Sequence, residues 1–245
     1  MTRSVRYALV VLLAMIGCSI AVFGQDMPAP ESEEPTEFSL GVSGGVLFVD
    51  PTTLNSSFTL VNTTLDRSMD RVRTVYPVGA HLRMAIGPHS YVVLRGEYIH
   101  FAREFSYDAL ATTASTIPSG SFPVTDKRTY TTIPFGLGVG VALNERRTIE
   151  GEIGVFYAFG MIDESGSMGP YGSFHSRADG SGWGLWLALR PRIHIARAIV
   201  LAPEFSGRFL SVGEFQDQNG RTLSGFRMDF RGVSVGAVLT VTFSQ

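Results

Sequence analysis

The chain has 245 residues, enough for one domain, and its 20 basic residues nearly balance 22 acidic residues. This balance excludes the net basic charge that marks nucleic-acid-binding proteins. The single cysteine, Cys18, lies in an N-terminal apolar run, so a disulfide scaffold and cysteine catalysis are excluded for a chain that loses this run.

Residues 1–24 have the composition of a secretory signal peptide. Arg3 and Arg6 precede an apolar run over residues 7–23, and small residues stand next to the expected cleavage point. A membrane anchor is the first alternative, but 17 residues are marginal for a span. Lipidation is the second, because the segment ending in Cys18 loosely resembles a lipoprotein cleavage box.

Residues 25–37 (QDMPAPESEEPTE) form an acidic segment rich in proline. Such a composition cannot bury a core, so we expect a short disordered leader. The remaining residues, 38–245, are expected to form one domain.

Apolar residues recur at every second position throughout this domain, which is the pattern of strands with one apolar face. Most of the predicted strands exceed the five or six residues that are usual in soluble proteins and reach the 9–11 residues that cross a membrane. Eight strands are predicted, at residues 38–49, 73–86, 90–103, 128–143, 147–161, 182–196, 198–212 and 226–243.

Long and short connections alternate between these strands. The long ones are loops at 50–72, 104–127, 162–181 and 213–225, whereas the others are tight turns. Outer-membrane barrels have long extracellular loops and short periplasmic turns. The sequence therefore predicts an all-β fold, an eight-stranded antiparallel up-and-down transmembrane β-barrel in the bacterial outer membrane.

The two faces of the strands differ in polarity. The more uniformly apolar face is expected to contact lipid, and the mixed face, which also carries His81 and His194, is expected to line the lumen. Alternating glycines Gly136, Gly138 and Gly140 on the inner face indicate a crowded lumen. The charged residues expected in the lumen are Arg83, Arg95, Glu97, Glu150, Glu152, Arg190, Arg192, Glu204 and Arg208.

The pattern of strands, loops and leader resembles the small outer-membrane barrels of the OmpA and OmpX type. Residues 130–138 (YTTIPFGLG) are similar to a strand of such barrel domains, and the last strand, with Phe243 near its end, resembles their assembly signal. The resemblance covers residues 38–243 and implies insertion by the barrel-assembly machinery among outer-membrane lipids.

Two functions are compatible with these features. The first is a non-catalytic structural or surface-interaction protein, whose lumen is filled by an Arg/Glu network and whose long loops contact an unknown extracellular ligand. The second is a small passive porin-like channel, in which the same charges line a constriction. The pattern predicts no enzyme, no metal site, no cofactor and no nucleic-acid partner, because no histidine has a clear serine partner on a neighbouring strand.

Overall fold

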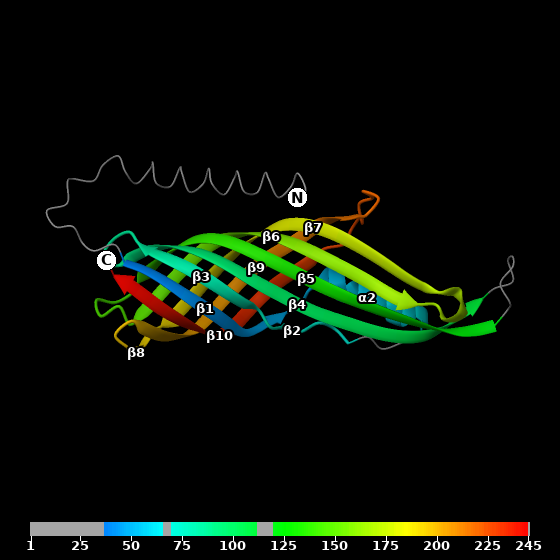
Figure 1. Cartoon of the computed structure of the whole chain (residues 1–245), viewed down its shortest axis with the longest axis horizontal. Helices are drawn as coiled ribbons and strands as arrows, with labels where there is room; N and C mark the ends of the chain where they lie inside the picture. Colours follow the sequence, from blue (N-terminus) through cyan, green and yellow to red (C-terminus); the bar gives the residue numbers. More distant parts are fainter. Residues whose placement is uncertain (1–36, 66–69, 112–119, 245) are drawn as a thin grey trace. The chain divides into compact units, whose positions relative to one another are not determined.

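A computed structural model describes residues 37–65, 70–111 and 120–244. Eight long strands and two short ones make one antiparallel sheet (Figure 1). No helix in these three stretches has both the length and the apolar composition needed to cross a membrane. The elements are β1 (Glu37–Val49), α2 (Thr52–Leu65), β2 (Thr74–Val75), β3 (Val78–Ala85), β4 (Ser90–Ala111), β5 (Gly120–Ala142), β6 (Ile149–Ser167), η1 (Gly169–Tyr171), β7 (Ser173–Pro191), β8 (Ile193–Ala196), β9 (Ile199–Asp217) and β10 (Met228–Ser244).

The sheet closes on itself. Each long strand pairs with its neighbours in the chain, and β10 pairs both with β9 and with β1, where Phe38 lies opposite Phe243. The short strands β2 and β8 continue the lines of β3 and β7. Closure leaves no open sheet edge along the paired length, which is what a strand protein needs where water is absent. The fold is thus the predicted all-β, eight-stranded up-and-down barrel.

The outer surface of the barrel carries the predicted apolar stripes. Leu187 and Val233 are each 61% exposed and Ile153 is 57% exposed, whereas their inward neighbours Trp186, Glu152 and Ser234 are buried. On β5 the outward residues are apolar from Val141 up to Ile133 and polar from Thr131 onward. At the usual strand tilt, this stretch of about ten residues spans the roughly 25 Å of a membrane barrel's apolar band.

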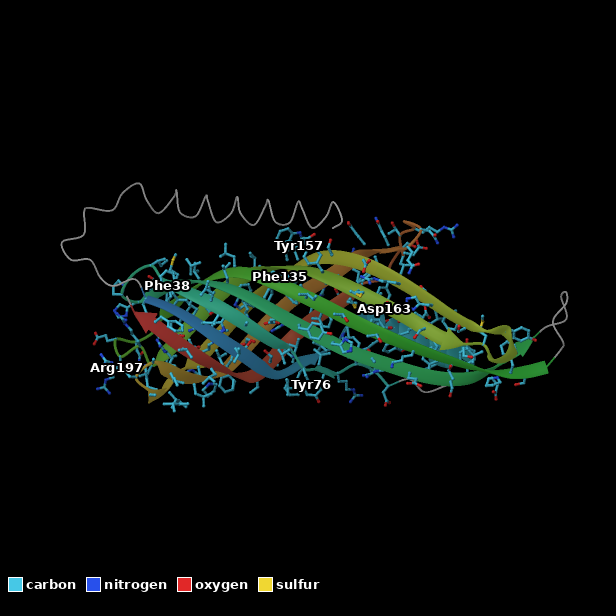
Figure 2. All side chains as sticks on the ribbon, viewed as in Figure 1. Phe38, Tyr76, Phe135, Tyr157, Asp163 and Arg197 are labelled. Atoms are coloured by element: carbon cyan, nitrogen blue, oxygen red, sulfur yellow. The ribbon has the colours of Figure 1, made fainter. Side chains whose placement is uncertain are left out.

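Aromatic side chains mark the upper limit of this apolar band. Tyr76, Phe135 and Tyr157 project from the outer surface near the middle of the strands, with Asp163 beyond them and Arg197 at the opposite end (Figure 2). Tyr157 also packs edge-on against Trp183 at 4.7 Å between ring centroids. Such aromatic girdles lie where lipid meets water.

The predicted loops at 104–127 and 162–181 are wrong over much of their length. β4 runs to Ala111, β5 begins at Gly120, and β6 and β7 continue to a short turn around η1. The alternation continues in these segments, but with polar residues outside and Phe105, Val124 and Asp126 inside. The strands therefore extend beyond the apolar band, whereas the apolar stripe predicts their ends where the outer face becomes polar.

The predicted loop at 50–72 contains helix α2. Pro51 precedes the helix, and its carbonyl accepts a hydrogen bond from the Asn55 amide (2.8 Å). Leu54 and Phe58, one helical turn apart, are each 1% exposed and belong to the apolar core. The helix packs against β10, and the Phe58 ring meets Tyr130 of β5 at 6.3 Å. The segment is therefore part of the barrel interior and not a free loop.

The signal-peptide prediction for 1–24, the lipidation alternative at Cys18 and all but the last residue of the 25–37 leader lie outside the described residues. That last residue, Glu37, is the first residue of β1 and pairs with Ser244. The strand therefore begins one residue before the predicted domain boundary.

Candidate functional site: the filled lumen

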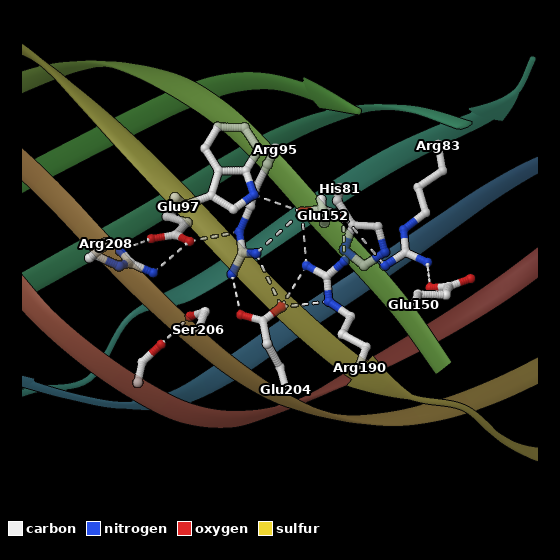
Figure 3. Close-up of polar contacts among 12 residues, drawn as sticks. His81, Arg83, Arg95, Glu97, Glu150, Glu152, Arg190, Glu204, Ser206 and Arg208 are labelled. Atoms are coloured by element: carbon white, nitrogen blue, oxygen red, sulfur yellow. Dashed lines mark hydrogen bonds and ion pairs between the residues drawn. The ribbon is translucent and has the colours of Figure 1, made fainter. Parts of the chain in front are cut away.

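The nine predicted lumen charges lie together in one cluster inside the barrel. Figure 3 labels all of them except Arg192, which joins the cluster through Glu150. Alternation along β3, β4, β6, β7 and β9 turns eight of these side chains inward, and closure of the sheet brings the strands face to face. Arg192 lies between β7 and β8. All are less than a tenth exposed apart from the Arg192 side chain at 17%. Charges so buried are tolerated only when they are paired and hydrogen-bonded.

Glu204 and Glu152 form the centre of the cluster. Glu204 accepts hydrogen bonds from Arg95 (2.8 Å) and Arg190 (2.7 Å). Glu152 accepts from Arg190 and, at 2.8 Å, from the indole nitrogen of Trp186. The Arg190 guanidinium therefore bridges two carboxylates and is 1% exposed.

Glu97 pairs with arginines on the side of the cluster nearer the long connections. It accepts from Arg95 Nε (2.7 Å) and from both terminal nitrogens of Arg208, one at 3.0 Å. This two-pronged geometry fixes the guanidinium plane more firmly than a single contact does.

Glu150 is shared by two arginines at the short-turn end. Arg83 donates to one oxygen (2.8 Å) and Arg192 to the other (2.9 Å). The Arg83 guanidinium also lies over the Tyr91 ring, 4.8 Å from its centroid. The cluster as a whole has five guanidinium groups and four carboxylates, so it carries one surplus positive charge.

Two histidines predicted on the lumen face have different positions. His81 lies inside, 3% exposed, with Nε2 3.4 Å from the Thr240 hydroxyl. His194 is exposed on β8, so its predicted place in the lumen is wrong. β8 lies at the rim, where all four of its residues face solvent or lipid.

The inner glycines make room for aromatic rings. A Cβ atom on Gly136 would stand 2.5 Å from the Trp186 ring, and one on Gly140 would overlap the Tyr91 ring. The predicted crowding is therefore produced by Trp186 and Tyr91, two lumen residues that are not among the predicted ones. The signal was available, since both alternate in phase with the predicted charges on their strands.

A second, apolar layer fills the lumen beyond the charge cluster. Helix α2 contributes Leu54 and Phe58 to it. The cavity found among Arg95, Glu97 and Glu204 is about 10 Å³, no more than the space of one water. The strand residues of the apolar layer include Leu47, Val49, Ile99, Tyr130, Phe156, Leu210, Val212, Phe215, Met228 and Phe230.

An open cavity of about 650 Å³ lies at the long-connection end. Arg71, Arg73 and Arg103 line it together with Asp70 and Thr74. No carboxylate among the described residues forms an ion pair with any of the three arginines, and Arg103 has a buried Nε atom without a hydrogen-bond partner.

Groups suited to catalysis are sparse in the described part of the chain. His100 Nδ1 lies 3.1 Å from the Thr131 hydroxyl on the outer face, and His175 lies 4.0 Å from Asp163. Within the described ranges, no group of three or more His, Cys, Asp or Glu side chains could hold a metal ion.

A closed barrel with an apolar outside and a charged inside reverses the arrangement of a soluble protein. Its outer surface is stable only against lipid, and closure pairs every backbone group along the band. The chain has the architecture of a bacterial outer-membrane β-barrel. Its lumen is packed, with ion pairs in one half and apolar side chains in the other.

No family model matches this barrel, and no curated protein matches it. Solved structures similar to it include Ail of Yersinia pestis (10% identity, TM-score 0.38, 87% of this chain and 99% of that one). Neisserial surface protein A has 10% identity and a TM-score of 0.38, over 85% and 97% of the two chains. A major outer membrane protein from Thermus thermophilus has 9% identity and a TM-score of 0.41, over 86% and 100%.

Proposed function

We propose that this barrel is a non-catalytic, non-conducting protein of the outer membrane that presents an interaction surface outside the cell. The observation that carries the proposal is the filled lumen. Ion pairs among nine charged side chains occupy one half, and helix α2 with its apolar contacts occupies the other. A passive channel needs a continuous water-filled path, and neither layer supplies one.

The alternative of a small channel is tested by conductance. The purified, folded chain in planar lipid bilayers is expected to give no unitary current steps, while a known porin in the same membrane gives steps. Stable steps whose size changes in Glu204→Gln would contradict the proposal and support the channel, because Glu204 lies at the centre of the charge cluster.

The expected interaction surface is the end of the barrel with long connections, which faces outward in barrels of this class. There β4, β5, β6 and β7 extend beyond the apolar band as two long hairpins. The same end has the open cavity lined by Arg71, Arg73 and Arg103. Unpaired arginines favour a partner with several negative charges, since the guanidinium group binds phosphate and carboxylate with two hydrogen bonds.

Binding of inorganic tripolyphosphate tests this surface. The double variant Arg71→Gln/Arg73→Gln should weaken binding at least tenfold at low salt, because it removes two of the three cavity arginines. The matched control is Arg221→Gln/Arg227→Gln, which removes the same charge from exposed positions outside the cavity. Equal losses in both variants would indicate a general charge effect and would remove the cavity from the proposal.

A further inference from the structure

A second cavity lies at the opposite end of the barrel, where the turns are short and where β1 begins. Its volume is about 60 Å³. One buried water needs roughly 10–15 Å³ of such space, so the cavity has room for a small polyatomic ion. Five charged residues line this mouth cavity: Glu37, Arg83, Arg147, Glu150 and Arg192.

The charges around the mouth cavity do not balance. Three arginines face two carboxylates, and Glu150 is already shared between Arg83 and Arg192. Among the described residues, Arg147 has no ion-pair partner. The surplus charge of the whole lumen cluster is therefore at this end, since Glu97, Glu152 and Glu204 are each held between arginines deeper inside.

Buried hydrogen-bond donors without a partner are concentrated beside the mouth cavity. Seven buried side-chain atoms of the described residues lack a hydrogen-bond partner, and three of them belong to Arg83 and Arg192. The Arg83 side chain is 8% exposed. Buried donors in native proteins are normally satisfied, by protein, water or ligand, so a cavity beside them is the natural place for an acceptor.

Arg147 adds an independent observation. It lies in the turn between β5 and β6 with φ 51°, in the left-handed region that favours glycine or asparagine. The turn is held by Asn144, whose side-chain oxygen accepts a hydrogen bond from the Thr148 amide (2.8 Å). The backbone gives no reason for an arginine at position 147, whereas its place at the edge of the mouth cavity does.

We propose that the mouth cavity binds one small oxyanion, a phosphate or a carboxylate, through Arg147, Arg192 and Arg83. The anion neutralises the surplus positive charge of the lumen cluster and accepts hydrogen bonds from the guanidinium groups. In the orientation of outer-membrane barrels this cavity faces the periplasm. The site is thus separate from the extracellular surface and would respond to ions or acidic groups on the other side of the membrane.

The test is the stability of the full, folded chain in sodium phosphate against sodium chloride at equal ionic strength. A ligand that binds only the folded state raises the unfolding midpoint with its concentration. Phosphate is expected to raise the urea midpoint to a plateau that chloride does not reach, and calorimetric titration should give saturable binding. Sodium acetate forms a second arm: stronger protection by acetate than by phosphate assigns the site to carboxylates.

Arg147→Asn is the deciding variant, because asparagine accepts the left-handed backbone and lacks the charge. It should keep the wild-type midpoint in chloride, and its affinity for phosphate should fall at least tenfold. The adjacent Arg146→Asn, which does not line the cavity, should bind as the wild type does. Arg192→Gln should also lose the phosphate effect while keeping a hydrogen-bond donor for Glu150.

The inference is overturned if neither phosphate nor acetate protects more than chloride does. It is also overturned if Arg147→Asn responds to these anions like Arg146→Asn, or if Arg147→Asn lowers the midpoint in chloride, which would assign Arg147 a purely structural role.

Discussion

The two halves of the lumen are filled in different ways. The half nearer the short turns is filled by ion pairs, in which every carboxylate serves two or more guanidinium groups. The other half is filled by apolar side chains and by helix α2, with Phe58 and Phe156 almost without exposure. Both arrangements exclude water, but the first is stabilised by charge pairing and the second by apolar packing.

The charged half is stable only when every charged side chain keeps its ion-pair partners. Each charge has lost its hydration, and the loss of one partner leaves another buried and uncompensated. The apolar half depends on packing, which is lost in proportion to the atoms removed. We therefore expect single changes in the charged half to be severe and pairwise changes to be partly compensating, whereas changes in the apolar half should be local.

The largest effect is expected for Glu204→Ala. It leaves Arg95 and Arg190 without their shared carboxylate and should cost about 3–5 kcal/mol of barrel stability. Adding Arg190→Ala should recover part of this loss. A double-mutant cycle measured by urea unfolding and heat-modified gel mobility checks both statements. Small, additive losses would show that the cluster is hydrated and that the two halves do not differ in this way.

The outer face is tested by Leu137→Arg on β5. Leu137 points outward within the apolar band, opposite Leu94 and Val155 on its neighbours. An arginine at the midplane of the lipid face should cost about 2–4 kcal/mol. Unfolding from lipid vesicles gives the value, and Thr129→Arg, on the polar outer part of the same strand, is the control. A neutral Leu137→Arg would mean that this face does not contact lipid.

Asn55→Ala tests how helix α2 is held in the apolar half. The Asn55 side chain donates to the Val72 carbonyl (3.1 Å) and accepts from the Val72 amide (2.8 Å). Losing these buried bonds should cost about 1–3 kcal/mol. The cost should appear as faster proteolysis between residues 50 and 74 with the barrel intact. Ser56→Ala, on the exposed side of the helix, should have no such effect.

The smallest effect concerns the β5–β6 hairpin, above the apolar band. Burial raises the pKa of Asp126 to about 6. The Arg128 guanidinium, whose Nη2 lies 3.0 Å from Asp126 Oδ2, lowers this pKa but does not cancel the effect of burial. A carboxyl group with a raised pKa stabilises the folded state below its usual pKa of 3.8, and this contribution is lost as the pH rises through 6. Protection of the hairpin amides from hydrogen exchange should therefore increase modestly from pH 7 to pH 5.

Asp126→Asn should remove this pH dependence of the protection factors, whereas Glu104→Gln on the outer face of β4 should leave it in place. A dependence that persists in Asp126→Asn would assign it to another group.

Much of the barrel could be read from the sequence, because a strand has a period of two. Alternation identified which residues of β3, β4, β6, β7 and β9 share a face, and the unequal connections indicated how the strands are joined. Alternation no longer marks a strand where both of its faces have similar polarity. The strands were ended too early at residues 103 and 161, because beyond the lipid band the outer face becomes polar and the stripe disappears.

Only the closed structure decided the partners within the lumen. Period two places Arg95, Arg190 and Glu204 on an inner face, but their contact depends on the stagger of strands that are far apart in sequence. The same holds for α2. Asp50 and Pro51 are a helix-start signal, and Leu54 and Phe58 have helical spacing, yet burial of that face requires a barrel wide enough to admit the helix. Local periodicity determines which way a side chain points, and only the tertiary structure determines what it meets there.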